Sequence, residues 1–126
     1  MILSNHRDDC GVCALANALA ISWTAAVKKI FPNGHTHKKR LNTTTKALVA
    51  ALGGGCKLKR VDDWRHIPDG SVVKVIPAQY EGTGNWHWVA WRAGKVWCSY
   101  NEQVMRPHEF KQMRLVSYLA KDSGNG

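Results

Sequence analysis

One stretch near the beginning decides how this chain folds: Asp8-Asp9-Cys10-Gly11-Val12-Cys13-Ala14-Leu15-Ala16-Asn17-Ala18-Leu19. Here an acidic turn becomes an Ala/Leu-rich helix, and Cys10 stands at the junction. Backbone N–H groups in the first turn of a helix lack an intrahelical partner and carry the positive end of the helix dipole. They stabilise a thiolate and can hold an oxyanion that develops beside the sulfur. The stretch therefore indicates that Cys10 can act as a nucleophile.

The length and composition of the chain indicate a single domain over residues 1–126. Of these residues 44% are hydrophobic, which is enough for one packed core. No apolar run approaches the roughly 18 residues that a membrane span needs. The first residues do not show a basic segment followed by an apolar core, as a secretory signal does. We therefore expect a cytoplasmic protein that does not enter a membrane.

The cysteines and the net charge indicate which chemical functions and partners to expect. Four cysteines stand at positions 10, 13, 56 and 98, and without a secretory signal we expect free thiols, a metal site or catalysis rather than disulfides. The formal charge of +9 favours an acidic protein or peptide, or nucleic acid, as partner. The densest basic positions are Lys38, Lys39, Arg40, Lys57, Lys59 and Arg60. The alternative is that they form a solvated face that contributes only to solubility.

The periodicity predicts an α+β fold, with helices in residues 1–55 and an antiparallel sheet in residues 56–120. Residues 121–126 are expected to form a frayed tail. Helices are predicted over residues 10–20 and 23–31, and Ser22 is the expected N-cap of the second. A third predicted helix is capped by Thr43 or Thr44 and runs to residue 52. The predicted strands are 56–61, half-buried, then 71–76, buried, and 85–91, 96–101 and 115–119, with a turn or short helix in 103–113.

His87 is the second candidate catalytic residue. It lies on a predicted strand whose hairpin carries four of the six tryptophans: Trp86, Trp88, Trp91 and Trp97. Because neighbours on a strand point to opposite faces, His87 looks away from Trp86 and Trp88 and is partly shielded from water. Such a histidine can pair with a nearby thiolate or take its proton. The alternative is an ordinary half-buried histidine.

A cysteine at the start of a helix, followed later by a histidine on a strand of an antiparallel sheet, is the papain-type order. The stretch Asp9-Cys10-Gly11-Val12-Cys13-Ala14-Leu15-Ala16 resembles the D-C-G-x-A-A-L-A start of small papain-like cysteine peptidases. This group includes the bacteriocin leader-processing domains of ABC exporters and compact phage-encoded relatives. His87-Trp88-Val89-Ala90-Trp91 resembles the segment that carries their histidine, and Gly94-Lys95-Val96-Trp97 resembles the next strand.

The resemblance implies a compact papain-like fold and a thiol peptidase that needs no cofactor or metal. Cys10 is then the nucleophile and His87 the base, and an amide or isopeptide bond of a protein substrate is cleaved through a thioester. Cys13 matches an alanine of the pattern and is expected to pack in the helix. A phage-encoded member would act in the host cytoplasm.

The sequence departs from the family pattern at two places. The family has an aspartate near the end of the strand after the histidine, whereas this chain has Cys98-Ser99-Tyr100-Asn101-Glu102. Asn101 can orient the imidazole through its amide oxygen, and Cys98, Ser99 and Glu102 are alternatives. A two-residue turn at Ala93-Gly94 puts position 100 opposite His87, and a shift of one residue puts 101 there. Upstream, where the family has a glutamine in the oxyanion hole, this chain offers Asn5 or His6.

Other functions fit parts of the same sequence. Cys10 and Cys13 have zinc-ligand spacing, and His35 and His37 complete a set of four, which would suit a basic nucleic-acid-binding module. Cys-Gly-Val-Cys is also similar to the thioredoxin redox motif, although no strand is predicted before it. On a papain-like fold the same pair also serves deamidation, isopeptide cleavage and acyl transfer, and a degenerate relative binds its partner without turnover.

Overall fold

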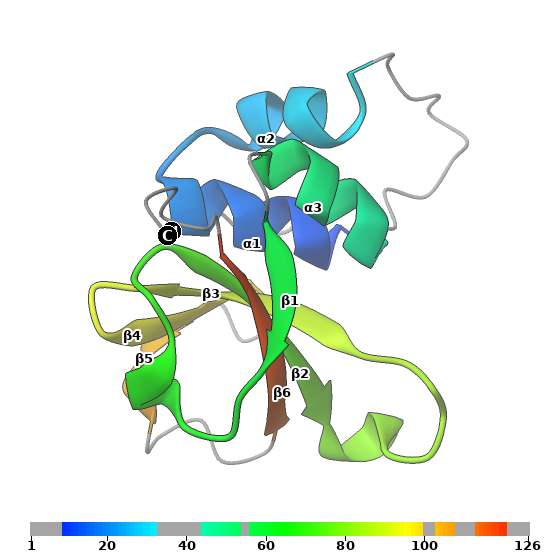
Figure 1. Ribbon diagram of the computed structural model, residues 1–126, viewed down its shortest axis with the longest axis vertical. Helices are drawn as coiled ribbons and strands as arrows, with labels where there is room; N and C mark the ends of the chain where they lie inside the picture. Colours follow the sequence, from blue (N-terminus) through cyan, green and yellow to red (C-terminus); the bar gives the residue numbers. More distant parts are fainter. Residues whose placement is uncertain (1–8, 33–43, 54–55, 100–102, 108–112, 121–126) are drawn as a thin grey trace.

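The chain is described from a computed structural model, which covers residues 9–32, 44–53, 56–99, 103–107 and 113–120. The predicted α+β class is confirmed, with the helices first and an antiparallel sheet after them. The helices are α1 (Cys10–Leu19), α2 (Trp23–Ile30) and α3 (Thr45–Leu52). Figure 1 shows the three helices on one side of the sheet, with α1 nearest to it.

Side chains cap two of these helices, as the sequence predicts. The Ser22 hydroxyl accepts a hydrogen bond of 3.0 Å from the backbone N–H of Ala25, at the start of α2. The Thr44 hydroxyl accepts one of 3.1 Å from Ala47 at the start of α3, so Thr44 rather than Thr43 is the cap. Each hydroxyl satisfies a first-turn N–H group, and this fixes where the helix begins.

In the described residues, six strands form one sheet in the order β1-β6-β2-β3-β4-β5, and every neighbouring pair is antiparallel. The strands are β1 (Lys57–Arg60), β2 (Ser71–Pro77), β3 (His87–Arg92), β4 (Lys95–Cys98), β5 (Gln103–Met105) and β6 (Met113–Ala120). Between β1 and β2 lies the short 3₁₀ helix η1 (Trp64–His66), and between β2 and β3 lies η2 (Ala78–Tyr80).

Two sequence-based predictions about the strands are wrong. The first strand was expected to be half-buried, but every side chain of β1 is exposed and Leu58 retains 45% of its accessible surface. The reason is its place at the edge of the sheet, where it pairs only with β6. A turn or short helix was expected in 103–113, yet that segment begins with β5, which pairs with β4.

The sheet separates two apolar clusters, because alternate residues of a strand point to opposite faces. On the helix side, Trp88 and Ala90 of β3 pack with α1 residues such as Val12 and Leu15. On the opposite side, Val89 packs with residues of β2 and β4 and with Ile67 and Trp64 from the β1–β2 connection. The β3 strand therefore contributes to both halves of the core.

The turn between β3 and β4 fixes the register of the candidate site. Ala93 and Gly94 both have positive φ, 55° and 70°, and Arg92 pairs with Lys95 across them. This is the two-residue turn, and its mirror-image geometry matches the twist of the strands. Alanine rarely adopts this conformation. Here the backbone N–H of Ala93 donates a hydrogen bond of 2.6 Å to the Asp69 carboxylate, which holds the turn in place.

Candidate active site

Cys10 is the first residue of α1 and is half-buried. The preceding Asp9 is almost fully buried, but its carboxylate makes no capping hydrogen bond to α1. It accepts a hydrogen bond of 2.9 Å from the indole N–H of Trp23 instead. The Asp9 side chain therefore binds α2 and does not cap the helix that begins at the candidate nucleophile.

α1 and β3 bring the beginnings of two distant segments to the same end of the molecule. Figure 1 shows that the two elements run in the same direction, one above the other. At their far ends the Arg92 guanidinium donates a hydrogen bond of 2.8 Å to the Asn17 carbonyl. Since Cys10 begins α1 and His87 begins β3, both lie at the opposite end of this pair of elements.

His87 lies in an apolar environment. Only 6% of its surface is exposed, and this burial lowers the pKa of the imidazole to about 4. A neutral ring is therefore favoured at neutral pH, because desolvation penalises the charged form. A neutral imidazole has one nitrogen that donates and one that accepts, so it can take a proton from another group.

The ring of His87 contacts Cys98, one of the alternative orienting residues. The distance between His87 Nε2 and Cys98 Sγ is 3.5 Å, and Cys98 is fully buried. The register explains the contact, because Ala90 pairs with Trp97 and Cys98 therefore lies across from Val89, on the same face as His87. The contact on Nε2 leaves Nδ1 as the nitrogen that faces away from Cys98.

Of the other residues expected in the site, the structure describes Ser99. Ser99 is buried and forms a hydrogen bond with Cys13, on the helix side of the sheet. Asn101, Glu102, Asn5 and His6 lie outside the described residues.

The pleat of β3 determines how Cys10 and His87 can meet. His87 shares the face of Val89, whereas α1 packs on the face of Trp88 and Ala90. A Cys10 thiol that met the imidazole would reach it around the beginning of β3, where His87 is the first strand residue.

Cys13 behaves as a packing residue. It is fully buried, and burial together with the neighbouring Asp9 carboxylate raises the pKa of its thiol to about 12. Zinc coordination and thiol–disulfide exchange both need a thiolate. A thiol held protonated in the core disfavours both alternatives. Within the described ranges, no group of three or more His, Cys, Asp or Glu side chains could hold a metal ion, and His35 and His37 lie outside those ranges.

The structure also shows two features that sequence reasoning missed. The first is the bond between Trp23 and Asp9, which joins α2 to the residue before the candidate nucleophile. Its only sequence signal was an acidic residue next to Cys10. The second is a hollow that contains Arg60 and Arg114, which come from different strands and carry no shared motif.

Comparison with protein-family models, with curated proteins and with solved structures finds no significant match for this chain. Among the described helices, none is long and apolar enough to cross a bilayer alone. α1 and α2 meet the length and composition criteria only when taken together, across a bend of 112°.

Proposed function

We propose that this protein is a cysteine-dependent hydrolase that cleaves an amide bond in a protein or peptide, with Cys10 as nucleophile and His87 as base. The observation that carries the proposal is the contact of 3.5 Å between His87 Nε2 and Cys98 Sγ, at the end of β3 where α1 begins. It gives the histidine an orienting partner on the strand where papain-like enzymes have one. Cys98 is the orienting residue in this proposal, in place of Asn101.

The mechanism follows from the tautomer that this contact favours. With Nε2–H donating to Cys98 Sγ, Nδ1 is the nitrogen that carries the lone pair, and in the proposed mechanism it accepts the proton of the Cys10 thiol. The low pKa of buried His87 favours a neutral imidazole at rest, so in the proposed mechanism proton transfer accompanies attack rather than preceding it.

The proposed reaction then proceeds in two halves. Cys10 Sγ forms a bond to the substrate carbonyl carbon while its proton passes to His87, and the oxyanion faces the first-turn N–H groups of α1. The imidazolium gives its proton to the leaving amine, which departs and leaves a thioester. Water, deprotonated by His87, attacks the thioester and releases the acid and the free thiol. Asn5 or His6 remains the proposed second oxyanion donor.

Alkylation of the native protein tests the proposed pair without knowledge of the substrate. Iodoacetamide should modify Cys10 before Cys13, Cys56 and Cys98, which are buried. His87→Ala should slow the modification of Cys10 by about 10²-fold, the lower end of the usual contribution of a general base. His66→Ala, at an exposed histidine on η1, is the matched control and should leave the rate unchanged. An equal Cys10 rate in both variants would refute the pairing.

Substitution of Cys98 tests its positioning role. Cys98→Asp places a carboxylate beside Nε2, which should raise the pKa of His87 by about 1–3 units and move the pH profile of Cys10 alkylation upward. Cys98→Ala removes the partner and should slow alkylation without that shift. A purely structural role predicts the same profile for both variants, with changes only in stability.

A second candidate is a papain-fold protein that binds its partner without turnover. It is favoured by the thiol of Cys98, which orients an imidazole less strongly than a carboxylate does. If the wild type forms no thioester with peptide libraries while Cys98→Asp does, binding without turnover becomes the better description.

A further inference from the structure

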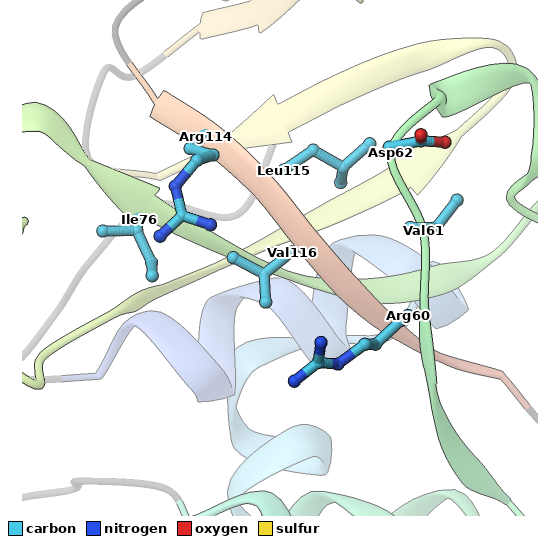
Figure 2. A pocket seen from close by; sticks show the side chains of 7 residues that line it. All are labelled: Arg60, Val61, Asp62, Ile76, Arg114, Leu115 and Val116. Atoms are coloured by element: carbon cyan, nitrogen blue, oxygen red, sulfur yellow. The ribbon is translucent and has the colours of Figure 1, made fainter.

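A hollow of about 660 Å³ lies over β1, β6 and β2. We call it the basic groove, and it is lined by Arg60, Val61, Asp62, Ile76, Arg114, Leu115 and Val116. Figure 2 shows the side chains of Arg60, Arg114, Ile76 and Val116 on one side of β6, and those of Leu115, Val61 and Asp62 on the other. The two guanidinium groups thus share a side with apolar residues, apart from the Asp62 carboxylate.

The pairing of the strands places the arginine side of the groove on the helix face of the sheet. Arg114 pairs with Ile76, which lies two residues beyond Lys74 on the same face of β2. Lys74 in turn pairs with Trp88, which packs against the helices. Arg60 pairs with Ser117, the β6 partner of Lys74. The arginines therefore face the side on which α1 lies.

One wall of the groove, on β2, lies beside the strand that carries His87. Ile76 follows Val75, which pairs directly with His87. Lys74 extends the row of cations toward β3, because its ammonium lies 4.2 Å from the ring centre of Trp86. Trp86 immediately precedes His87 in the chain. One strand spacing, about 4.8 Å, separates the β2 wall of the groove from the strand that carries the histidine.

The charges of the groove are only partly compensated. Arg114 forms an ion pair of 2.9 Å with Glu81, and both side chains remain about half exposed, at 57% and 48%. Arg60 is exposed, and the described part of the chain provides no ion pair for it. Three cations, Arg60, Lys74 and Arg114, thus outnumber the two carboxylates at the groove, which are Glu81 on Arg114 and Asp62 on the other side of β6.

We propose that the basic groove binds an acidic segment of the protein substrate and so places the neighbouring amide bond at Cys10. This inference rests on the proposed hydrolase function and specifies its substrate class. Arginine forks bind carboxylates with two parallel hydrogen bonds, and Ile76 and Val116 provide apolar contact for the stems of aspartate or glutamate. Nucleic acid fits less well, because Lys74 covers one face of the Trp86 ring and competes there with a stacking base.

Binding can be measured without catalysis in the Cys10→Ala protein. The probe is fluorescein-labelled hexaglutamate, and labelled hexaglutamine and a labelled single-stranded oligothymidine are the comparison ligands. Binding is measured by fluorescence anisotropy at low salt. Hexaglutamate should bind to the protein. The double variant Arg60→Gln, Arg114→Gln should lower the affinity about tenfold, because each exposed charge pair contributes about threefold. Lys28→Gln with Lys29→Gln removes the same charge from the exposed face of α2 and should have little effect.

A variant that is expected to bind hexaglutamate more tightly provides a second test. Glu81→Gln frees Arg114 and should strengthen hexaglutamate binding by about threefold. Asp63→Asn, which removes a partly buried carboxylate paired with Arg65 outside the groove, makes the same change in net charge and should not do so. Circular dichroism confirms that each variant is folded.

Three results would overturn the proposal. The first is an equal loss of hexaglutamate affinity in the groove variant and the α2 variant. The second is that hexaglutamate does not bind. The third is that oligothymidine binding depends on Arg60 and Arg114 while hexaglutamate binding does not. The last result would identify a nucleic-acid site. If hexaglutamate binds as expected but Cys10 alkylation is independent of His87, the groove stands and the hydrolase proposal fails.

Discussion

The buried imidazole of His87 should make the protein less stable in mild acid. Its pKa is lowered from 6.5 to about 4 by burial, so between these values the unfolded chain binds a proton that the folded chain does not. The stabilising effect of the neutral ring is fully present above pH 6.5 and is lost as the pH falls toward 4. Integration of both titrations gives a loss of about 2 kcal/mol in the free energy of unfolding between pH 7 and pH 5.

Urea denaturation at pH 7 and pH 5, followed by tryptophan fluorescence, measures this loss directly. The interval avoids most of the carboxylate titration, because the Asp63 and Glu81 pKa values are lowered by their arginine partners. His87→Asn should remove the pH dependence, whereas His66→Asn, at an exposed histidine, should retain it.

The opposite result would change the proposed mechanism. If the wild type is equally stable or more stable at pH 5, His87 carries its proton in the folded state. The resting site would then contain an imidazolium, as in a thiolate–imidazolium ion pair, and the neutral imidazole inferred from burial would be wrong.

Three further predictions concern the scaffold. Ser117→Ala should stabilise the protein by about 1 kcal/mol in urea denaturation, because this buried hydroxyl has no hydrogen-bond partner among the described residues. Gly94→Ala should cost about 1 kcal/mol and lower the melting temperature, since φ at this position is 70°, and Gly94→Asn should cost less. Arg92→Met removes the hydrogen bond to Asn17 and should speed amide exchange in α1, whereas Lys95→Met, at an exposed position of the same hairpin, should not.

The sequence predicts local features well because local chemistry determines them. Ser22 and Thr44 begin their helices where a hydroxyl precedes an apolar periodicity, and both form the expected bonds. The exposure of Leu58 could not be predicted in this way. It depends on β6, the last strand, pairing between β1 and β2, so that β1 is left at the edge.

The candidate site was predictable in part for a similar reason. The positions of Cys10 on a helix start and His87 on a strand followed from local patterns. The contact between His87 and Cys98 depends on the length of the turn, and that turn places Ala93 in a conformation that alanine disfavours. The Asp69 carboxylate holds it there from another loop, so only the tertiary structure distinguishes Cys98 from its neighbours.

The exposed edge strand β1 has a consequence for behaviour at high concentration. A strand with an unpaired edge is a template on which a second chain can add, and such addition leads to aggregation. Three of the four residues of β1 are cationic, Lys57, Lys59 and Arg60, and two copies meeting along this edge would bring these charges together. The repulsion is electrostatic and weakens as salt shortens the Debye length. The same cations should therefore keep the protein monomeric in dilute buffer and become less protective in concentrated salt.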